Sequence, residues 1–561
     1  SYQSWTEGDL TWTLTADGTL TISGTGAMKD YDANNSPVAQ KKASVKKVVI
    51  ANGVTSIGRS AFFDCTGLTS INIPKSVTSI GDYAFDSCSN LASIEIPKSV
   101  TSIGKSAFYN CNGLTSITIP SSVTSIGSGV FSKCNKLTVY LENGSTLTYN
   151  DLGVNESQIA TYWNEDNLTW TLAADGTLTI SGEGEMKDYF HDSPATQKKD
   201  IVKKVVIEDG VTSIGMYAFF GYSSLTSIEI PESVTSIGIY AFCDCSSLTD
   251  ITIPGSVTSI GGSALYGCTS LTSIEIPSSV TSIGIGVFDG CTVLKEVDIP
   301  STVEAIPQSA FDTCQKLETV NINTVNSKLK KIGEKAFYAD LSLVDIKFPA
   351  SLKEIGDNAF YGCSGIEQIE LPKSLTTIGN RVFMHCSGIT KAVISEGTKA
   401  IGVNAFSLCT GLTEVSIPST MVTIDDSAFE TCEKLETVNI NTKNCKLEKI
   451  GSFAFHDCGS LVNIEFPASL KEIGEGAFLK CNSLKKVDLQ EGLETIGNSA
   501  FSRCNGLTEI SVPVGVKSLG QLIFNQSNNV KTATIPAAMF DKDSLTTKAL
   551  ESLVVLDDGT T

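Results

Sequence analysis

The segment LTSIEIPESVTSIGIYAFCDC, residues Leu225–Cys245, recurs along the chain with small changes and decides the fold. Nearly every copy brings a cysteine to the same point, and successive cysteines are separated by steps of 23 residues. The positions in phase are Cys65, Cys88, Cys111, Cys134, Tyr222, Cys245, Cys268, Cys291, Cys314, Asp340, Cys363, Cys386, Cys409, Cys432, Cys458, Cys481, Cys504 and Ser527, which makes 18 repeats, 15 of them with cysteine. A unit this short cannot bury its own apolar face, so the copies must stack on one another.

Each unit follows the pattern C-x-x-L-x-x-I-x-I-P-x-S-V-x-x-I-G-x-x-A-F-x-x. The L-x-x-I-x-I segment ends in an apolar/polar alternation of β-branched residues, which predicts a half-buried strand closed by proline. V-x-x-I-G predicts a second short strand, with glycine permitting the turn that follows. The phenylalanine column is broken only by Leu265, and the glycine column only by Pro307 and Asp425.

This pattern resembles the leucine-rich repeats of the BspA-like class of bacterial surface proteins. The resemblance implies a mainly β repeat solenoid, a right-handed superhelix or horseshoe with a parallel β-sheet on its concave face. It also implies a surface or secreted protein that adheres to proteins of the host matrix or of other cells.

The cysteine column is interpreted as architecture. Free cysteine behaves as a small buried hydrophobe with a weak S–H donor, which can meet a backbone carbonyl at a repeat corner. Asp340 and Ser527 hold the same position, and neither can form a disulfide. The chain has no C-x-x-C spacing of the kind found at zinc sites. We therefore expect no disulfide, no metal site and no cofactor.

Two segments outside the repeats match each other at an offset of 158 residues: WTLTADGTLTISGTGAMKDY from Trp12 and WTLAADGTLTISGEGEMKDY from Trp170. A loop at residues 16–18 would place Leu14 opposite Leu20 and Trp12 opposite Ile22, as in a β-hairpin. Such hairpins suit the caps that a solenoid needs. The predicted organisation is a cap at 1–45, four repeats at 46–139, a linker at 140–167, a second cap at 168–202 and fourteen repeats at 203–561, the last one interrupted.

The net charge of −20 makes phosphate backbones and anionic lipids poor partners, so neither nucleic acid binding nor membrane insertion is expected. No apolar run approaches the ~20 residues that span a bilayer. The chain lacks the usual nucleophile, phosphate-loop and metalloprotease motifs, and has only three histidines, His191, His385 and His456. The sequence therefore predicts no enzyme and no catalytic residues.

In-register stacking would align the residue between the two isoleucines of each unit along one exposed row. The acidic members of this row in the longer repeat block are Glu229, Glu275, Asp298, Glu370, Glu465 and Asp488. Neighbouring like charges on adjacent strands are mildly destabilising. The row is either a ligand-binding face or a solvated face that keeps the solenoid soluble.

The resulting hypothesis is an extracellular or cell-surface monomer, not an enzyme, that binds proteins through an extended polar face. One alternative is a glycan-binding module, which would depend on sparse aromatic residues such as Tyr140. Another is a passive spacer that presents a further domain and binds no ligand.

Overall fold

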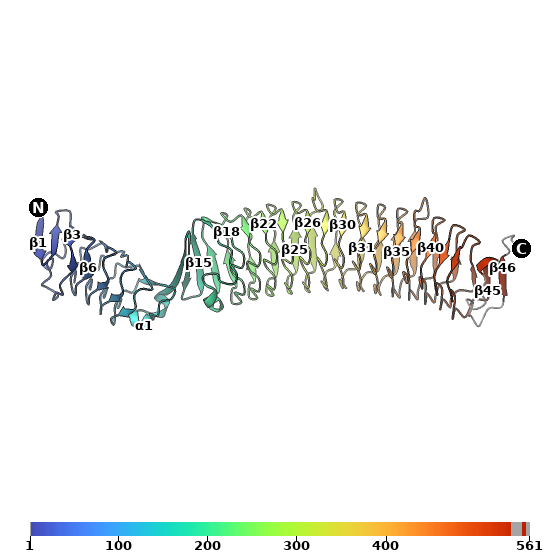
Figure 1. The fold of residues 1–561 in the computed structure, drawn as a ribbon. Helices are drawn as coiled ribbons and strands as arrows, with labels where there is room; N and C mark the ends of the chain where they lie inside the picture. The colour runs from blue at the N-terminus through green and yellow to red at the C-terminus, as the bar shows by residue number, and fades with distance from the viewer. Residues whose placement is uncertain (1, 540–551, 557–561) are drawn as a thin grey trace. The chain divides into compact units, whose positions relative to one another are not determined.

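The structure of the chain is a computed structural model that describes residues 2–539 and 552–556. It divides into two compact units (Figure 1). The first unit comprises Ser1–Gly182 with Ile201–Glu208, and the second comprises Glu183–Asp200 with Asp209–Thr561. Both are built from stacked coils, so the predicted β-solenoid is confirmed.

Each tryptophan-containing segment forms an antiparallel β-hairpin. In the first, β2 (Leu10–Leu14) pairs with β3 (Thr19–Gly24) so that Trp12 lies opposite Ile22 and Leu14 opposite Leu20, as predicted. β1 (Gln3–Glu7) adds a third strand beside β2. The second hairpin consists of β14 (Leu168–Ala173) and β15 (Thr177–Gly182), with β13 (Ile159–Glu165) beside β14.

The coils of the first unit contribute two rows of parallel strands. One row is β5 (Lys47–Ile50), β7 (Ser70–Asn72), β10 (Ser116–Ile119), β12 (Thr138–Glu142) and β17 (Lys204–Ile207). The other is β4 (Gly26–Ala27), β6 (Val54–Ile57), β8 (Ser79–Ile80), β9 (Ser102–Ile103) and β11 (Ser125–Ile126). The only α-helix among the described residues of this unit is α1 (Tyr149–Leu152), followed by a short 3-10 turn, η1 (Glu156–Gln158).

The second unit has the same two rows. The row that follows each conserved leucine contains β19 (Ser227–Glu229), β21 (Asp250–Ile251), β23 (Ser273–Glu275), β25 (Glu296–Ile299), β27 (Thr319–Ile322), β29 (Asp345–Ile346), β31 (Gln368–Glu370), β33 (Lys391–Val393), β35 (Glu414–Ile417), β37 (Thr437–Ile440), β39 (Asn463–Glu465), β41 (Lys486–Asp488), β43 (Glu509–Ser511), β45 (Thr532–Pro536) and β46 (Ser552–Leu556). The row that precedes each glycine contains β16 (Gly184–Glu185), β18 (Val211–Ile214), β20 (Ser236–Ile237), β22 (Ser259–Ile260), β24 (Ser282–Ile283), β26 (Ala305–Ile306), β28 (Lys331–Ile332), β30 (Glu354–Ile355), β32 (Thr377–Ile378), β34 (Ala400–Ile401), β36 (Thr423–Ile424), β38 (Lys449–Ile450), β40 (Glu472–Ile473), β42 (Thr495–Ile496) and β44 (Ser518–Leu519). Two 3-10 turns, η2 (Thr196–Ile201) and η3 (Ala537–Met539), complete the elements.

The core of each unit is a stack of phenylalanine rings, one from each coil. In the first unit, Phe62, Phe85 and Phe108 stack at 5.3 and 5.2 Å between ring centroids. In the second unit the stack is interrupted at Leu265 and then runs without a break from Phe288 to Phe501, with all rings fully buried or nearly so. Because every coil presents the same flat side chain at the same place, the rings fix the translation from one coil to the next.

The cysteines line the same interior. In the coils after the first, the thiol donates to the carbonyl oxygen at the phenylalanine position of the preceding coil, as Cys88 Sγ does to Phe62 O at 3.2 Å and Cys363 Sγ to Phe337 O at 3.1 Å. Cys291 makes the same bond to Leu265 O at 3.3 Å. Ser527 Oγ makes the equivalent bond to Phe501 O at 2.8 Å. The predicted structural role of the thiols is therefore confirmed, and serine can replace it.

The glycine column has a different cause from the one expected. Gly238 does not have the left-handed backbone that would require glycine. A Cβ added there would lie 2.6 Å from Met216 N and 2.7 Å from Gly215 C, both backbone atoms of the preceding coil. The column is glycine because consecutive coils approach closely, and not because of the following turn.

Residues 140–167 extend the solenoid of the first unit. β13 pairs in parallel with β12, the last repeat strand, along one edge and antiparallel with β14 along the other. The strand order β10–β12–β13–β14–β15–β17 therefore runs from the repeats into the second hairpin. At the other end of the chain, the interrupted repeat predicted at residues 550–561 lies outside the described residues except for β46.

Candidate functional site

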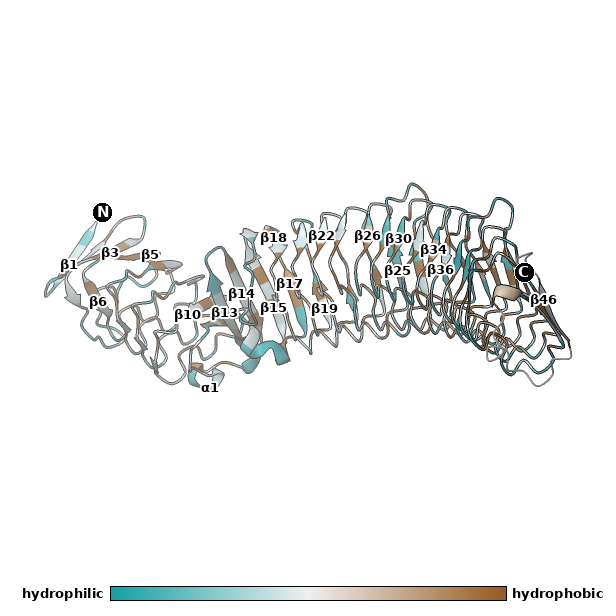
Figure 2. Ribbon diagram, turned by 45° about the vertical axis from the view of Figure 1, so that its right-hand side comes forward, coloured by the Kyte–Doolittle hydropathy of each residue, from teal (hydrophilic) through white to brown (hydrophobic). Residues whose placement is uncertain are grey.

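The six acidic residues of the predicted row all lie exposed on strands of one row in the second unit. Glu275 on β23 lies opposite Asp298 on β25, and Glu465 on β39 lies opposite Asp488 on β41. In Figure 2 the strands of the second unit carry both hydrophilic and hydrophobic stretches. Glu229 and Glu370 lie on other strands, β19 and β31. The acidic residues therefore form separate small groups along the row and not a single cluster.

The acidic row contains a carboxylate that accepts a hydrogen bond from a neighbouring side chain. Asn321 Nδ2 donates to Asp298 Oδ1 at 2.7 Å and to Glu296 Oε1 at 2.8 Å. Glu465 and Asp488 carry like charges on two paired parallel strands. Neighbouring strands of a sheet are about 4.8 Å apart. The row is thus a polar, hydrogen-bonded face whose ligand-binding role remains a prediction.

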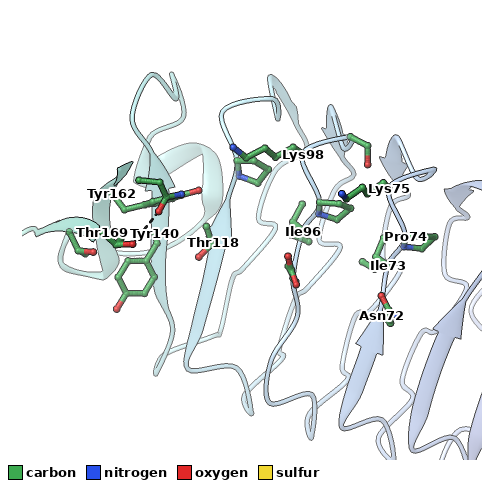
Figure 3. Close-up of a pocket in the computed structure, with 16 residues that line it drawn as sticks. Asn72, Ile73, Pro74, Lys75, Ile96, Lys98, Thr118, Tyr140, Tyr162 and Thr169 are labelled. Carbon is green, nitrogen blue, oxygen red and sulfur yellow. Dashed lines mark hydrogen bonds between the residues drawn. The ribbon is translucent and has the colours of Figure 1, made fainter. Parts of the chain in front are cut away.

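The first unit contains a groove of about 1170 Å³ over its leucine-row strands (Figure 3). We call it the first-unit groove. It is lined by Asn72, Ile73, Pro74, Lys75, Glu95, Ile96, Pro97, Lys98, Ser99, Thr118, Pro120, Tyr140, Tyr162, Asn164, Thr169 and Thr171. Figure 3 shows Lys75 and Lys98 beside the prolines along one rim, while Asn72, Thr118 and Tyr140 project from the strands.

The groove lies where the regular ladder of strands is interrupted. Between β7 and β10 the intervening segment makes only an isolated bridge, from Ser70 to Ser93. The same segment carries Ser99, whose buried hydroxyl has no hydrogen-bond partner among the residues that the structure describes. In the next coil Ser122 Oγ, at the equivalent position, donates to Val100 O at 2.9 Å. The first-unit groove thus lies beside the coil in which regular strand pairing is lost.

A polar cluster around Glu142 on β12 lies next to two lining residues of the groove, Lys98 and Tyr162. Glu142 accepts hydrogen bonds from Ser121 N at 2.8 Å and from its hydroxyl at 3.0 Å, and these bonds lower the pKa of the carboxyl. Lys98 Nζ lies 3.4 Å from Glu142 and adds to this effect. Burial, together with Glu142, raises the pKa of Tyr162 to about 12. Both groups hold a fixed protonation state at neutral pH.

A second hollow, the second-unit groove, has a volume of about 1150 Å³. It lies over β29, β31 and β33, and Glu370 of the predicted row lines it. Its other lining residues include Asp345, Lys347, Phe348, Glu367, Leu371, Lys373 and Lys391. Phe348 packs edge-to-face on the core ring of Phe360 at 5.9 Å, which holds its side chain in place.

The three histidines do not form a common centre. His191 contacts the rings of Tyr217 and Phe220, while His456 Nδ1 lies 3.1 Å from Glu430 Oε1. Within residues 2–539 and 552–556, no group of three His, Cys, Asp or Glu could hold a metal ion. No helix in this part of the chain is long and apolar enough to cross a bilayer.

Sequence reasoning missed the first-unit groove as a site. The sequence marks Tyr140 only as a sparse aromatic residue, and the repeat pattern does not single out Lys75, Lys98 or Tyr162. Tyr162 lies outside the 23-residue repeat, so the row on which it stands could not be read from the repeat pattern. The parallel pairing of β13 with β12 brings it beside Glu142.

The comparisons with known proteins agree with this architecture. The family described as "BspA type Leucine rich repeat region" matches residues 37–151, 212–331, 330–449 and 442–550, in 6 copies. A search of curated proteins gives no match. A leucine-rich repeat protein from Bacteroides ovatus is 28% identical, covers 69% of this chain and 99% of its own, and superposes with a TM-score of 0.53.

A leucine-rich repeat protein from Eubacterium ventriosum is 26% identical over 69% of this chain and 95% of its own, with a TM-score of 0.29. The family match alone covers well over half of the sequence and includes repeats of both units. The chain therefore belongs to the BspA-type leucine-rich repeat family.

Proposed function

We propose that this chain is a non-enzymatic protein, located at the cell surface or secreted, that binds other proteins through the second-unit groove. Membership of the leucine-rich repeat family supports a role in protein interaction, because such solenoids use extended concave surfaces to bind macromolecules. The same membership supports a bacterial surface location.

The observation that carries this proposal is the composition of the second-unit groove. It combines exposed charges of both signs with the half-buried aromatic side chain of Phe348. Protein interfaces typically place an aromatic anchor inside a polar rim. Phe348 is half-buried and braced by Phe360, so it can contact a partner without losing much conformational freedom.

The charge of the molecule favours a partner with a basic surface. The chain carries a formal charge of −20, and Glu370 and Glu367 stand exposed at the groove. Long-range attraction would speed the encounter with a basic partner and would weaken as salt is added. Proteins of the host matrix or of other cells are the partners that the family resemblance implies.

The test is a binding screen of the full chain against immobilised matrix proteins. Phe348→Ala and Glu370→Lys are each expected to weaken binding by about tenfold or more, the loss typical of an interface hot spot. Glu334→Lys makes the same charge change outside the groove, and is the control that should bind normally. If no protein binds, or if all three variants bind as the wild type does, the proposal is wrong and the spacer hypothesis gains support.

A further inference from the structure

We propose that the first-unit groove binds an oligosaccharide. This proposal does not depend on the protein-binding function of the second unit, because the two grooves share no residue. It rests on the side chains that line the groove, on the groups among them that have no partner, and on the strands that form its floor.

The floor of the groove is a row of side chains that suit hydroxyl groups. Asn72, Glu95, Thr118 and Tyr140 occupy the same position in four successive coils, and Thr118 lies directly opposite Tyr140 in the β10–β12 ladder. Amide and hydroxyl groups both donate and accept hydrogen bonds, as a sugar hydroxyl does. The row therefore offers complementary partners at regular intervals along the groove.

Tyr140 supplies the apolar contact that a sugar ring requires. The C–H face of a pyranose packs on an aromatic ring while its hydroxyl groups point outward to polar partners. Tyr140 is half-buried on β12, and within the described residues no other aromatic ring stacks on it. Its ring is thus held at the base by the strand and has a face available to a ligand.

Three polar side chains of the groove are not engaged with the protein. Within the described residues, Asn72, Lys75 and Glu95 make no side-chain hydrogen bond or ion pair. A carboxylate accepts several hydrogen bonds, so Glu95 can take two neighbouring hydroxyls of one sugar. The contrast is Asp298 in the other unit, which accepts from Asn321 at 2.7 Å.

The shape of the groove argues against a protein ligand. The apolar side chains under the floor, Ile73 and Ile96, are only 8% and 5% exposed, so no deep apolar pocket is open to an anchoring side chain. A peptide that adds a strand needs a free sheet edge. β12, which carries Tyr140, lies inside the sheet, since it pairs with β10 on one side and with β13 on the other.

The volume is consistent with several sugar residues. Pockets for small molecules usually measure roughly 300–1,000 Å³, and the groove reaches about 1170 Å³. It is elongated across the strands, from Asn72 on β7 to Thr169 on β14. A short oligosaccharide can therefore contact Tyr140 and Glu95 together, which a monosaccharide would do less completely.

The experiment is a screen of the full chain on an array of neutral and acidic oligosaccharides, followed by titration of the best binder. Tyr140→Ala and Glu95→Gln are each expected to weaken binding by about tenfold. Tyr149→Ala removes an exposed tyrosine of α1 outside the groove, and Glu370→Lys alters the other unit; both should bind normally. Circular dichroism of each variant establishes that it folds.

Two results would overturn the proposal. One is the absence of saturable binding to any oligosaccharide on the array. The other is saturable binding that both folded groove variants retain at wild-type strength, which would place the sugar elsewhere. Neither result bears on protein binding by the second unit, since that is tested with Phe348→Ala and Glu370→Lys.

Discussion

Replacing Asp340 with cysteine is expected to stabilise the second unit at pH 7, by up to about 4 kcal/mol. Asp340 occupies the thiol position of its coil and is fully buried. Neither of its carboxyl oxygens has a hydrogen-bond partner of normal geometry. Burial raises the pKa of Asp340 well above its usual value, and the nearby backbone N–H of Cys314 offsets only part of this effect.

The magnitude follows from the cost of keeping this carboxyl protonated. An unfolded aspartate has a pKa of about 3.9, and holding it neutral costs about 1.4 kcal/mol for each pH unit above that value. At pH 7 the interval is about three units, which sets an upper bound of about 4 kcal/mol. Cysteine is neutral at this pH in both states, and in the coils on either side it satisfies a phenylalanine carbonyl.

The sign of the pH dependence is fixed by the raised pKa. Since folded Asp340 binds its proton more tightly than the unfolded residue, the wild type gains stability as pH falls toward about 4. Asp340→Cys lacks this gain, so its advantage should shrink as the pH falls from 7 to 4, by at most about 1.4 kcal/mol for each pH unit. Asp289 and Asp312, which also raise the pKa of Asp340, remain in both proteins.

The assay is native-state hydrogen exchange of the amides around residue 340, because a long repeat array does not unfold in a single two-state step. Ser527→Cys is the control: Ser527 already donates to Phe501 O at 2.8 Å, so little change and no pH dependence are expected. An advantage of Asp340→Cys that stays constant between pH 7 and pH 4, or no advantage at all, would refute the reasoning.

Two further predictions concern the coil-to-coil contacts. Gly238→Ala should destabilise the second unit by about 1–3 kcal/mol, because its Cβ would collide with the backbone of the preceding coil, whereas Gly255→Ala, with open space around its Cβ, should melt as the wild type does. Glu465→Gln should stabilise by about 0.2–1 kcal/mol by removing the repulsion from Asp488, and this gain, measured by thermal melting, should vanish at about 1 M salt.

The features that follow from repetition could be predicted from the sequence. The hairpin register of Trp12 and Ile22 follows from the spacing around a short glycine-containing turn, and the stacking of Glu275 on Asp298 follows from the constant step between coils. A constant step places equivalent residues opposite each other whatever their chemistry. For that reason the exposed acidic row follows from the sequence, while its ligand-binding role stays a prediction.

Features that depend on departures from the repeat could not be predicted. The first-unit groove opens where one coil loses its regular ladder, near Ser93, and no obvious change in the repeat signature marks that place. β13 joins the repeat sheet through pairing between segments that share no pattern, Thr138–Glu142 and Ile159–Glu165. The glycine column was identified, but its cause is an approach between coils that a single unit does not reveal.

The residue type at the thiol position is determined by a backbone carbonyl of the preceding coil. In the coils after the first, a cysteine here donates to a carbonyl oxygen of the coil before, as Cys88 does at 3.2 Å, so a small donor suits the position. At the start of the second unit no earlier phenylalanine coil exists, and the position is held by Tyr222, whose hydroxyl lies 3.2 Å from Ser193 Oγ. Cysteine is therefore retained because it is a small donor that costs little to bury, and only serine matches its hydrogen bond.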